Sequence, residues 1–273
     1  METINLDGTT PNIVVDPQTS NWAKETQVKV NITDSQSGVK YYKYAITDSK
    51  DTPSSWSSNI ASVNGTITIN TEAEKYLHII AEDNVGNITS DNIFGPYYID
   101  RTAPSINANP QNCDWTQETQ VQVNFTDGGA GFKQYRYAIT DSRNSPTTWS
   151  DYITKSTDTI MINTETEKYL HIIAEDNIGN ISEDIVNGPY FIDRTNPTIQ
   201  VLGDLQTIVI DELTLDLEAT DIPSGVETFK LDGEVIFNGN HTFYKNGTHT
   251  LEAIDKAGNI SNLEFEITNI YYE

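Results

Sequence analysis

The sequence is poor in cysteine, in basic residues and in long apolar runs, and each shortage excludes a class of protein. Cys113 is the one cysteine among 273 residues, so neither an intrachain disulfide nor a cluster of thiolate metal ligands can form. Small secreted domains of eukaryotes usually carry disulfides, so a cysteine-poor extracellular protein is more typical of bacteria. No stretch approaches the ~18 consecutive apolar residues of a membrane-spanning helix, which predicts no direct membrane insertion.

The scarcity of basic residues limits the partners. There are 16 Lys and Arg against 40 Asp and Glu, which gives a formal net charge of −24. Nucleic acids and anionic lipids are bound through basic side chains, so this balance predicts no nucleic-acid partner. Hydrophobic residues make up 36% of the chain and aromatic residues 10%, so the composition is that of a folded, acidic protein and not of a disordered one.

An internal repeat organises the chain. Trp22 recurs as Trp115 and Trp56 recurs as Trp149, and the members of each pair are 93 positions apart (115 − 22). A third, diverged copy follows and lacks both tryptophans. Each copy opens with an aspartate four positions before a proline and carries an Asp-x-x-Gly-Asn motif near its end.

The repeat predicts three modules, at residues 1–99, 100–192 and 193–273, of which the second closely repeats the first. The linkers that cross the two boundaries, 97–104 and 190–197, contain neither glycine nor serine. We therefore expect the linkers to be short and stiff and the modules to form an elongated rod.

The pattern inside a module is that of β-strands. Apolar Val28, Val30 and Ile32 alternate with polar residues, which is the period of a half-buried strand. Seven short antiparallel strands in about 90–100 residues are typical of an immunoglobulin-like β-sandwich. The predicted fold is therefore all-β, with three tandem immunoglobulin-like sandwiches. The strands expected in the first module cover residues 11–15, 28–32, 40–47, 58–62, 66–70, 77–81 and 92–99.

The turn and linker motifs of the modules resemble those of a known family. The segments that carry the resemblance are Asp100-Arg-Thr-Ala-Pro104, Ser37-Gly-Val39 and Asp255-Lys-Ala-Gly-Asn259. They are similar to the bacterial Ig-like repeat domains of large surface and secreted proteins of Gram-positive bacteria. The resemblance implies an extracellular location, at the bacterial cell surface or secreted. No secretion signal follows Met1, so we expect the chain to be a monomeric fragment of a longer protein.

The acidic surplus makes calcium the one cofactor that we consider. Ca²⁺ takes six to eight oxygen ligands, and junctions between stacked sandwiches are natural places for it. No stretch matches an EF-hand loop, and the competing interpretation is that the aspartates cap turns in which glycine and asparagine tolerate positive φ. The candidate ligands at expected loops and junctions are Asp34, Asp83, Asn87 and Asp100, with the repeat equivalents Asp127, Asp176, Asn180 and Asp193.

The tryptophans are the candidate ligand contacts. We expect Trp22 and Trp115 just before the second strand, and Trp56 and Trp149 after a proline-containing loop. Exposed aromatic rings stack on sugar rings, so these residues are candidates for contact with a host or cell-surface glycan or protein. The core of an immunoglobulin-like sandwich also requires a large aromatic side chain, so packing is the competing interpretation.

Patterns that indicate catalysis are missing from the sequence. Its four histidines show no metal-ligand spacing, and it contains neither a nucleophile elbow nor a phosphate-binding glycine loop. We therefore expect no enzyme, and predict a non-catalytic extracellular structural or stalk region of a bacterial surface protein. The alternatives are direct adhesion or glycan binding through the tryptophan-bearing loops of the first two modules, and an accessory spacer of a secreted polysaccharide-active enzyme.

Overall fold

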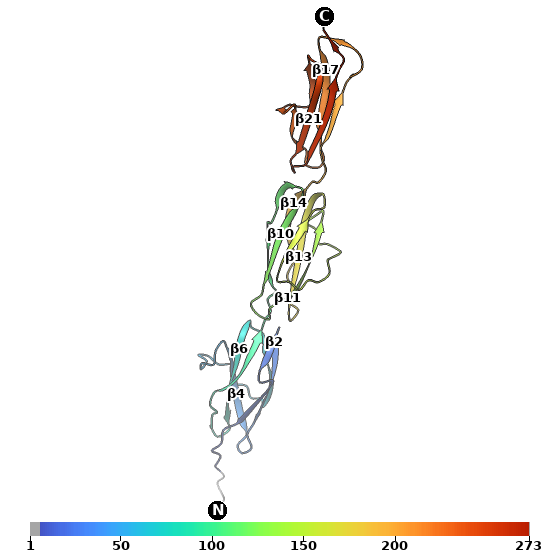
Figure 1. Cartoon of the computed structure of the whole chain (residues 1–273). Helices are drawn as coiled ribbons and strands as arrows, with labels where there is room; N and C mark the ends of the chain where they lie inside the picture. Colours follow the sequence, from blue (N-terminus) through green and yellow to red (C-terminus); the bar gives the residue numbers. More distant parts are fainter. Residues whose placement is uncertain (1–5, 273) are drawn as a thin grey trace, which may run out of the picture. The chain divides into compact units, whose positions relative to one another are not determined.

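The computed structural model describes residues 6–272, and every regular element in that range is a β-strand (Figure 1). Among these residues, no helix has the length and hydropathy needed to cross a bilayer. The chain is all-β, as the alternation of apolar and polar residues predicts.

The strands between residues 12 and 99 form two sheets of an immunoglobulin-like sandwich. One sheet has the order β1-β3-β5 and the other β2-β7-β6-β4. Neighbours are antiparallel, except that β2 pairs with β7 in parallel. The strands are β1 (Asn12–Asp16), β2 (Ser20–Ala23), β3 (Thr26–Thr33), β4 (Val39–Thr47), β5 (Asn64–Ile69), β6 (Ala73–Asp83) and β7 (Asn92–Ile99).

The strands between residues 105 and 192 repeat this arrangement. Their sheets have the orders β12-β10-β8 and β11-β13-β14-β9, and β9 pairs with β14 in parallel. The strands are β8 (Ser105–Asn109), β9 (Cys113–Thr116), β10 (Thr119–Thr126), β11 (Phe132–Thr140), β12 (Thr157–Ile162), β13 (Thr166–Asp176) and β14 (Ile185–Ile192).

The remaining strands form sheets of the orders β15-β17-β20 and β19-β18-β21-β22, with β16 and β23 as a parallel pair. They are β15 (Thr198–Leu202), β16 (Val209–Ile210), β17 (Leu213–Thr220), β18 (Val226–Leu231), β19 (Glu234–Val235), β20 (Gly239–Phe243), β21 (Gly247–Asp255), β22 (Ile260–Ile267) and β23 (Ile270–Tyr271).

The chain divides into two compact units. The first contains the residues up to Ser105 together with 126–134 and 174–182, and the second contains 106–125, 135–173 and the residues from Glu183 onward. The expected module boundaries, Asp100 and Asp193, both lie between strands, after β7 and after β14. The number of modules and their boundaries stay predictions.

Alternating side chains form the core of the first repeat. In β3, buried and exposed residues alternate over all eight positions, so Val28, Val30 and Ile32 all point inward. They pack in one cluster with Leu77 and Ile79 of β6, which belongs to the other sheet. Burying each such side chain contributes about 1.5–3 kcal/mol, so this contact between the faces of the two sheets holds the sandwich together.

Two details of the expected strands are wrong. Residues 58–62 form no strand, because only Ile60 meets the edge of β4, in a single bridge to Tyr42. A strand is present instead at Ser20–Ala23, where Trp22 lies. This strand has four residues and pairs with β7 through Ser20 and Ala23, so it is too short to show a period of two.

Tyrosine, and not tryptophan, supplies the largest buried aromatic side chains of the first two repeats. Tyr42 and its equivalent Tyr135 are 2% and 1% exposed. The Tyr135 hydroxyl donates to Asp158 Oδ2 at 2.9 Å. The position equivalent to Asp158 is Gly65, where an added Cβ would lie 2.5 Å from the Tyr42 hydroxyl oxygen. The first repeat therefore requires glycine at the position where the second holds an acceptor.

We expect Gly65→Ala to destabilise the protein by about 1–3 kcal/mol, because the new methyl group overlaps the Tyr42 hydroxyl. In a Tyr42→Phe background the nearest remaining atom would be Cζ at 3.7 Å, so the cost of Gly65→Ala should largely vanish. Urea denaturation of the four proteins of this double-mutant cycle measures the coupling.

Gly128→Ala is the matched control, since an added Cβ there meets nothing within 4 Å. It should be neutral or slightly stabilising. Equal costs of Gly65→Ala with and without the Tyr42 hydroxyl would contradict the steric explanation.

Candidate cation sites

Three aspartates converge in each of the three repeats. In every set, one carboxylate oxygen from each residue lies within 4.8 Å of the others. Among the described residues, these are the groups of three or more acidic, cysteine or histidine side chains close enough to share one ion. They are the first triad, Asp7, Asp34 and Asp83; the second triad, Asp100, Asp127 and Asp176; and the third triad, Asp193, Asp221 and Asp255.

Each triad draws its members from the same three places in the fold. In the second triad, Asp100 directly follows β7 and so lies in the linker, Asp127 follows β10, and Asp176 is the last residue of β13. Since β10 and β13 belong to different sheets, the carboxylates come from the linker and from both layers of the sandwich. Asp193, Asp221 and Asp255 occupy the corresponding places after β14, after β17 and at the end of β21.

The last aspartate of each triad caps the turn of the Asp-x-x-Gly-Asn motif. Asp83 is fully buried, and its Oδ1 accepts the backbone N–H groups of Val85, Gly86 and Asn87 at 2.9, 2.6 and 2.8 Å. Gly86 has a φ of 101°, so it supplies the left-handed residue of the turn. Burial alone would raise the pKa of Asp83, but hydrogen bonds from Asn87 and from the turn amides outweigh it and lower the pKa.

The asparagine of the motif joins this turn to the start of the repeat. Asn87 Nδ2 donates to Asp83 Oδ2 at 2.6 Å and to the backbone carbonyl of Asp7 at 3.3 Å. Asn180 makes the same bonds to Asp176 and to the carbonyl of Asp100. Asn87 and Asn180, which we expected as oxygen ligands, therefore present their amide nitrogens to the triads.

The first and middle aspartates hold the other loop. In the third triad, Asp193 Oδ2 accepts the N–H of Ser224 at 3.0 Å, and Asp221 Oδ2 accepts the N–H of Gly225 at 2.9 Å. Asp193 Oδ1 accepts from Thr195, whereas Asp221 Oδ1 accepts no hydrogen bond that the structure describes. The middle aspartate thus keeps a carboxylate oxygen available.

The middle aspartate is the member of the triad whose ionisation its surroundings disfavour. Burial raises the pKa of Asp127, and the neighbouring carboxylates of Asp100 and Asp176 raise it further. Burial alone would raise the pKa of Asp100 as well, but hydrogen bonds from Ala130 and Thr102 outweigh it and lower the pKa. Asp100 is therefore ionised, and its negative charge opposes the ionisation of the neighbouring Asp127 carboxyl group.

The third triad shows the same arrangement. Burial raises the pKa of Asp221, and Asp193 and Asp255 raise it further, while hydrogen bonds from Ser224 and Thr195 lower the pKa of Asp193 against its burial. Like charges this close are stabilised by a bound proton or a bound cation. A donor set made only of carboxylate oxygens fits a hard cation such as Ca²⁺, with water or further oxygens completing six to eight ligands.

The first triad differs from the other two at its first aspartate. Asp7 is half-buried, whereas its equivalents Asp100 and Asp193 are fully buried. Hydrogen bonds from Ser37 and Thr9 lower the pKa of Asp7 to about 2.

Sequence reasoning identified six of these nine aspartates and missed Asp7, Asp221 and Asp255. The repeat in the sequence contains the information needed to find these three residues. Asp7 stands 93 positions before Asp100 (100 − 7), Asp255 opens the third Asp-x-x-Gly-Asn motif, and Thr220-Asp221 repeats Thr33-Asp34.

The four tryptophans lie in two different settings, and all are half-buried. Trp22 packs against Tyr98 and Trp115 against Phe191, each with ring centroids 5.1 Å apart. Trp56 lies in the loop between β4 and β5. Its equivalent Trp149 has the Arg136 guanidinium 5.2 Å from its ring centroid. Each tryptophan therefore packs on the surface of a sandwich and leaves part of its ring exposed.

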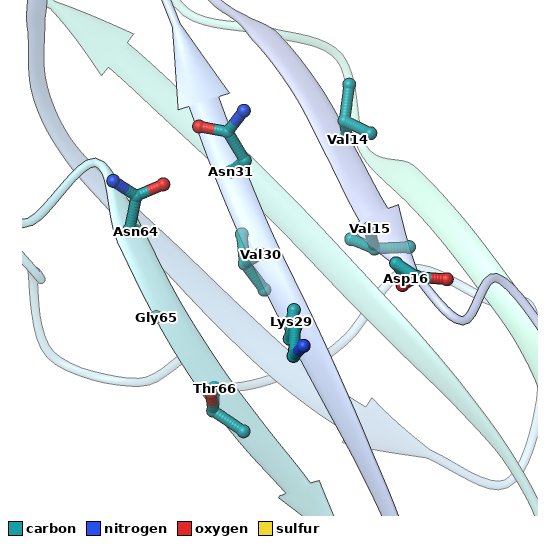
Figure 2. A pocket seen from close by; sticks show the side chains of 9 residues that line it. All are labelled: Val14, Val15, Asp16, Lys29, Val30, Asn31, Asn64, Gly65 and Thr66. Atoms are coloured by element: carbon teal, nitrogen blue, oxygen red, sulfur yellow. The ribbon is translucent and has the colours of Figure 1, made fainter.

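A hollow of about 550 Å³ lies on the sheet β1-β3-β5 (Figure 2). Its floor lies where Val15, Val30 and Gly65 stand opposite one another on three neighbouring strands. Figure 2 shows the side chains that border it on either side of this row, and the missing side chain at Gly65. The lining residues are Val14, Val15, Asp16, Lys29, Val30, Asn31, Asn64, Gly65 and Thr66.

Comparisons with known proteins find neither a matching protein-family model nor a matching curated protein. Among solved structures, the chain is similar to the fibronectin(III)-like modules of Clostridium thermocellum CbhA, at 12% identity and a TM-score of 0.30, over 66% of this chain and 94% of that one. It is also similar to extracellular domains 3–5 of Drosophila OTK, at 10% identity and a TM-score of 0.38, over 93% and 94% of the two chains.

A third similar structure is that of the N-terminal eight Ig domains of Down Syndrome Cell Adhesion Molecule, at 13% identity and a TM-score of 0.40, over 96% of this chain and 37% of that one. At these values, the strand pairing of the chain itself remains the basis for describing its sandwiches as immunoglobulin-like.

In excess chelator at neutral pH, we expect Asp127→Asn to stabilise the protein by on the order of 1 kcal/mol. The substitution removes a charge that Asp100 and Asp176 oppose, while the new amide oxygen still accepts the Gly131 N–H, which lies 2.6 Å from Asp127 Oδ2. A group with a raised pKa stabilises the folded state below that pKa and loses this contribution as the pH rises through it. The gain from Asp127→Asn should therefore shrink as the pH falls.

Thermal unfolding of both proteins between pH 4 and pH 7 measures this difference. Asp151→Asn, at an exposed position of the same repeat, is the control and should change little. A variant that is less stable than the wild type in chelator at pH 7 would show that the Asp127 charge is not under repulsion.

Proposed function

We propose that this chain is a non-catalytic spacer of an extracellular bacterial protein, built as a series of immunoglobulin-like sandwiches that calcium fastens at the start of each repeat. The observation that carries the proposal is the threefold recurrence of the triad, with one carboxylate always supplied by the segment that enters the repeat. A spacer requires a defined length and a defined stiffness, and a cation bound by the triad where the chain enters each repeat would contribute to both.

A cation in the second triad would join three segments of the first compact unit. Asp100 belongs to the linker, Asp127 to the loop after β10, and Asp176 to the turn after β13. The linker is already held by the bond from Asn180 Nδ2 to the Asp100 carbonyl. The ion would add a charged cross-link to this contact and would offset both the burial and the repulsion from Asp100 and Asp176 that raise the pKa of Asp127.

The same unit holds a further bond of this kind. Lys24 Nζ, in the turn between β2 and β3, donates to the carbonyl of Gly179 at 2.8 Å. Gly179 belongs to the Asp-x-x-Gly-Asn turn that Asp176 caps. A cation that rigidifies the turn would therefore stabilise the contact with Lys24 as well.

Extracellular conditions suit such a site. Calcium sites of extracellular modules bind with dissociation constants of about 10⁻⁴–10⁻³ M, so a few ligands completed by water are sufficient outside the cell. The close similarity of the first two repeats also suits a spacer, because a repeated module adds length without requiring a distinct surface.

We expect excess CaCl₂ to raise the unfolding temperature above its value in chelator. A ligand at 100 times its dissociation constant stabilises the folded state by about 2.7 kcal/mol per site. The double variant Asp127→Asn and Asp221→Asn, which neutralises the middle aspartates of the second and third triads, should lose most of this gain. Calorimetry with and without CaCl₂ measures both effects.

The Asp151→Asn variant should keep the full calcium response. Isothermal titration should give more than one site per chain in the wild type and fewer in the double variant. Unfolding temperatures that are equal in CaCl₂ and in chelator would contradict the calcium part of the proposal, whatever the stability of the variants.

A second candidate function is adhesion through the second repeat. Arg136 lies 5.2 Å from the ring centroid of Trp149 and 5.3 Å from that of Tyr152, which is 52% exposed. Arginine, tryptophan and tyrosine are the side chains most enriched where interfaces gain their affinity. The equivalents of Arg136 and Tyr152 in the first repeat are Lys43 and Asn59, so this combination is specific to the second.

If the chain itself binds a glycan or a protein, Trp149→Ala should weaken binding about 30-fold or more and Trp56→Ala should leave most of the affinity. Truncating a central aromatic residue of an interface typically costs 2 kcal/mol or more, about a 30-fold loss of affinity. Glycan and matrix-protein arrays followed by titration measure the effect. Equal losses for the two variants would argue against a site specific to the second repeat.

A further inference from the structure

Two fully buried histidines lie outside the triads and the tryptophan surfaces. His78 is in β6 and His171 is its equivalent in β13, and both are 0% exposed. Leu77, His78 and Ile79 are buried one after another, so both faces of the strand are covered at this point. One face is the core, and His78 points away from it.

Each ring nitrogen of His78 has an oxygen partner. Nδ1 lies 2.8 Å from Asp91 Oδ2, and Nε2 lies 2.9 Å from Thr47 Oγ1 and 3.2 Å from the carbonyl oxygen of Ser49. His171 has the same partners in the second unit, namely Asp184 Oδ2 at 2.9 Å, Thr140 Oγ1 at 3.0 Å and the Ser142 carbonyl at 3.1 Å.

These contacts assign a hydrogen to Nε2. The Ser49 carbonyl can only accept, and the single hydrogen of the Thr47 hydroxyl is donated to that carbonyl at 2.6 Å. A bare Nε2 would therefore face two oxygen lone pairs. The Nε2–H form donates to both oxygens. If the Thr47 hydroxyl turned toward the ring instead, Thr47 Oγ1 and the Ser49 carbonyl oxygen would lie 2.6 Å apart without a hydrogen between them.

The aspartate side assigns a second proton. Asp91 Oδ1 is buried without a hydrogen-bond partner, as is Asp184 Oδ1, so the imidazole is the hydrogen-bond partner of each carboxylate. A proton shared between Nδ1 and the carboxylate makes the pair neutral as a whole. Removal of either proton would leave a net negative charge on a pair whose imidazole is fully buried and whose carboxylate is only about one-fifth exposed, which is costly.

His249 in the third repeat provides the contrast. Its Nδ1 lies 2.7 Å from Asp232 Oδ2, but its Nε2 has no hydrogen-bond partner. A neutral ring with its proton on Nδ1 satisfies this arrangement, so no second proton is required.

The pairs hold the loops that carry Trp56 and Trp149. Ser49 is near the start of the loop between β4 and β5, and the loop is fixed again where the Ser57 N–H donates to the Tyr44 carbonyl at 2.8 Å. Ser142 has the same place in the loop between β11 and β12, where the Ser150 N–H donates to the Tyr137 carbonyl at 2.8 Å.

We propose that the His78–Asp91 and His171–Asp184 pairs are proton-dependent clamps, which hold the first part of the loops 48–63 and 141–156, up to Trp56 and Trp149, against the sheets when two protons are bound and release it when one is lost. The proton that matters is the one on Nε2, because it makes the bonds to Thr47 and Ser49, or to Thr140 and Ser142. Its loss removes the contact at the start of the loop, while the later part of the loop stays fixed by the backbone bonds at Ser57 and Ile60, or at Ser150 and Ile153.

Other charged groups near the clamps are paired or turned away. Lys75 and Lys168 form ion pairs with Asp48 and Asp141. The charged groups on the same sheet face or in the same loop include Lys43, Lys50 and Asp51 in the first repeat, and Arg136, Arg143 and Asp151 in the second. Glu82 and Glu175, four positions after the histidines, form ion pairs with Lys40 and Lys133. Glu74 and Glu167 accept hydrogen bonds from the hydroxyl groups of Tyr76 and Tyr169. Asp51 accepts from Ser49, and Lys50 and Arg143 lie over the rings of Tyr76 and Tyr169.

The experiment is a pH titration between pH 6 and pH 9 in excess chelator, so that the triads hold no metal. Burial raises the pKa of the Cys113 thiol, so this group does not titrate in the range. Nitrogen-15 NMR of the wild type should show His78 and His171 with both ring nitrogens protonated at pH 6 and a change on raising the pH. Tryptophan emission should change over the same range, because one released proton shifts the loop equilibrium by up to tenfold per pH unit.

In His78→Gln with His171→Gln, the emission should no longer depend on pH, whereas His249→Gln should keep the dependence of the wild type. NMR spectra that show His78 and His171 as rings protonated on one nitrogen at pH 6 would overturn the proposal without the use of any variant. Tryptophan emission that does not change between pH 6 and pH 9 while both histidines lose a proton would overturn the link to the loops.

Discussion

The buried carboxylate at the end of β6, β13 and β21 is the interaction on which the rest of each repeat depends. In the first repeat this is Asp83, which has no exposed surface and satisfies three amides of the turn that follows. The turn brings the last long strand back beside β6, and Asn87 extends the same network to the carbonyl of Asp7. Asp83 therefore closes a hairpin and places an acidic group between two loops, and through Asn87 it is connected to the start of the repeat.

This arrangement has an electrostatic consequence that the fold alone does not relieve. The turn needs a side-chain carboxyl oxygen that accepts its amides, and the segment that enters the repeat contributes a second aspartate, such as Asp100, which its own hydrogen bonds keep ionised. A third, Asp127, is placed where both of them oppose its charge. Capping and repulsion thus come from the same geometry, and a divalent cation is the ligand that removes the repulsion while leaving the capping bonds in place.

Much of the fold follows from local pattern. The alternation along β3 and the turn at Gly86 depend on near neighbours in the chain, so they can be read directly. The strand at Ser20–Ala23 could not, because its four residues are held by a parallel partner almost eighty positions away. The same holds for His78, whose sequence setting is that of a surface position on a strand, while loop 48–63 and Asp91 bury it.

By itself, the sequence determined the class of the fold, the repeat and the aspartates at turns and junctions, because periodicity, turn chemistry and recurrence act over a few residues or over a constant offset. Only the tertiary structure decided that Asp100, Asp127 and Asp176 meet, that tyrosine occupies the core while the tryptophans lie at its surface, and that a histidine is enclosed with two sets of acceptors. Each of these depends on which strands become neighbours, and that is decided by the packing of the two sheets over distances that the local pattern does not encode.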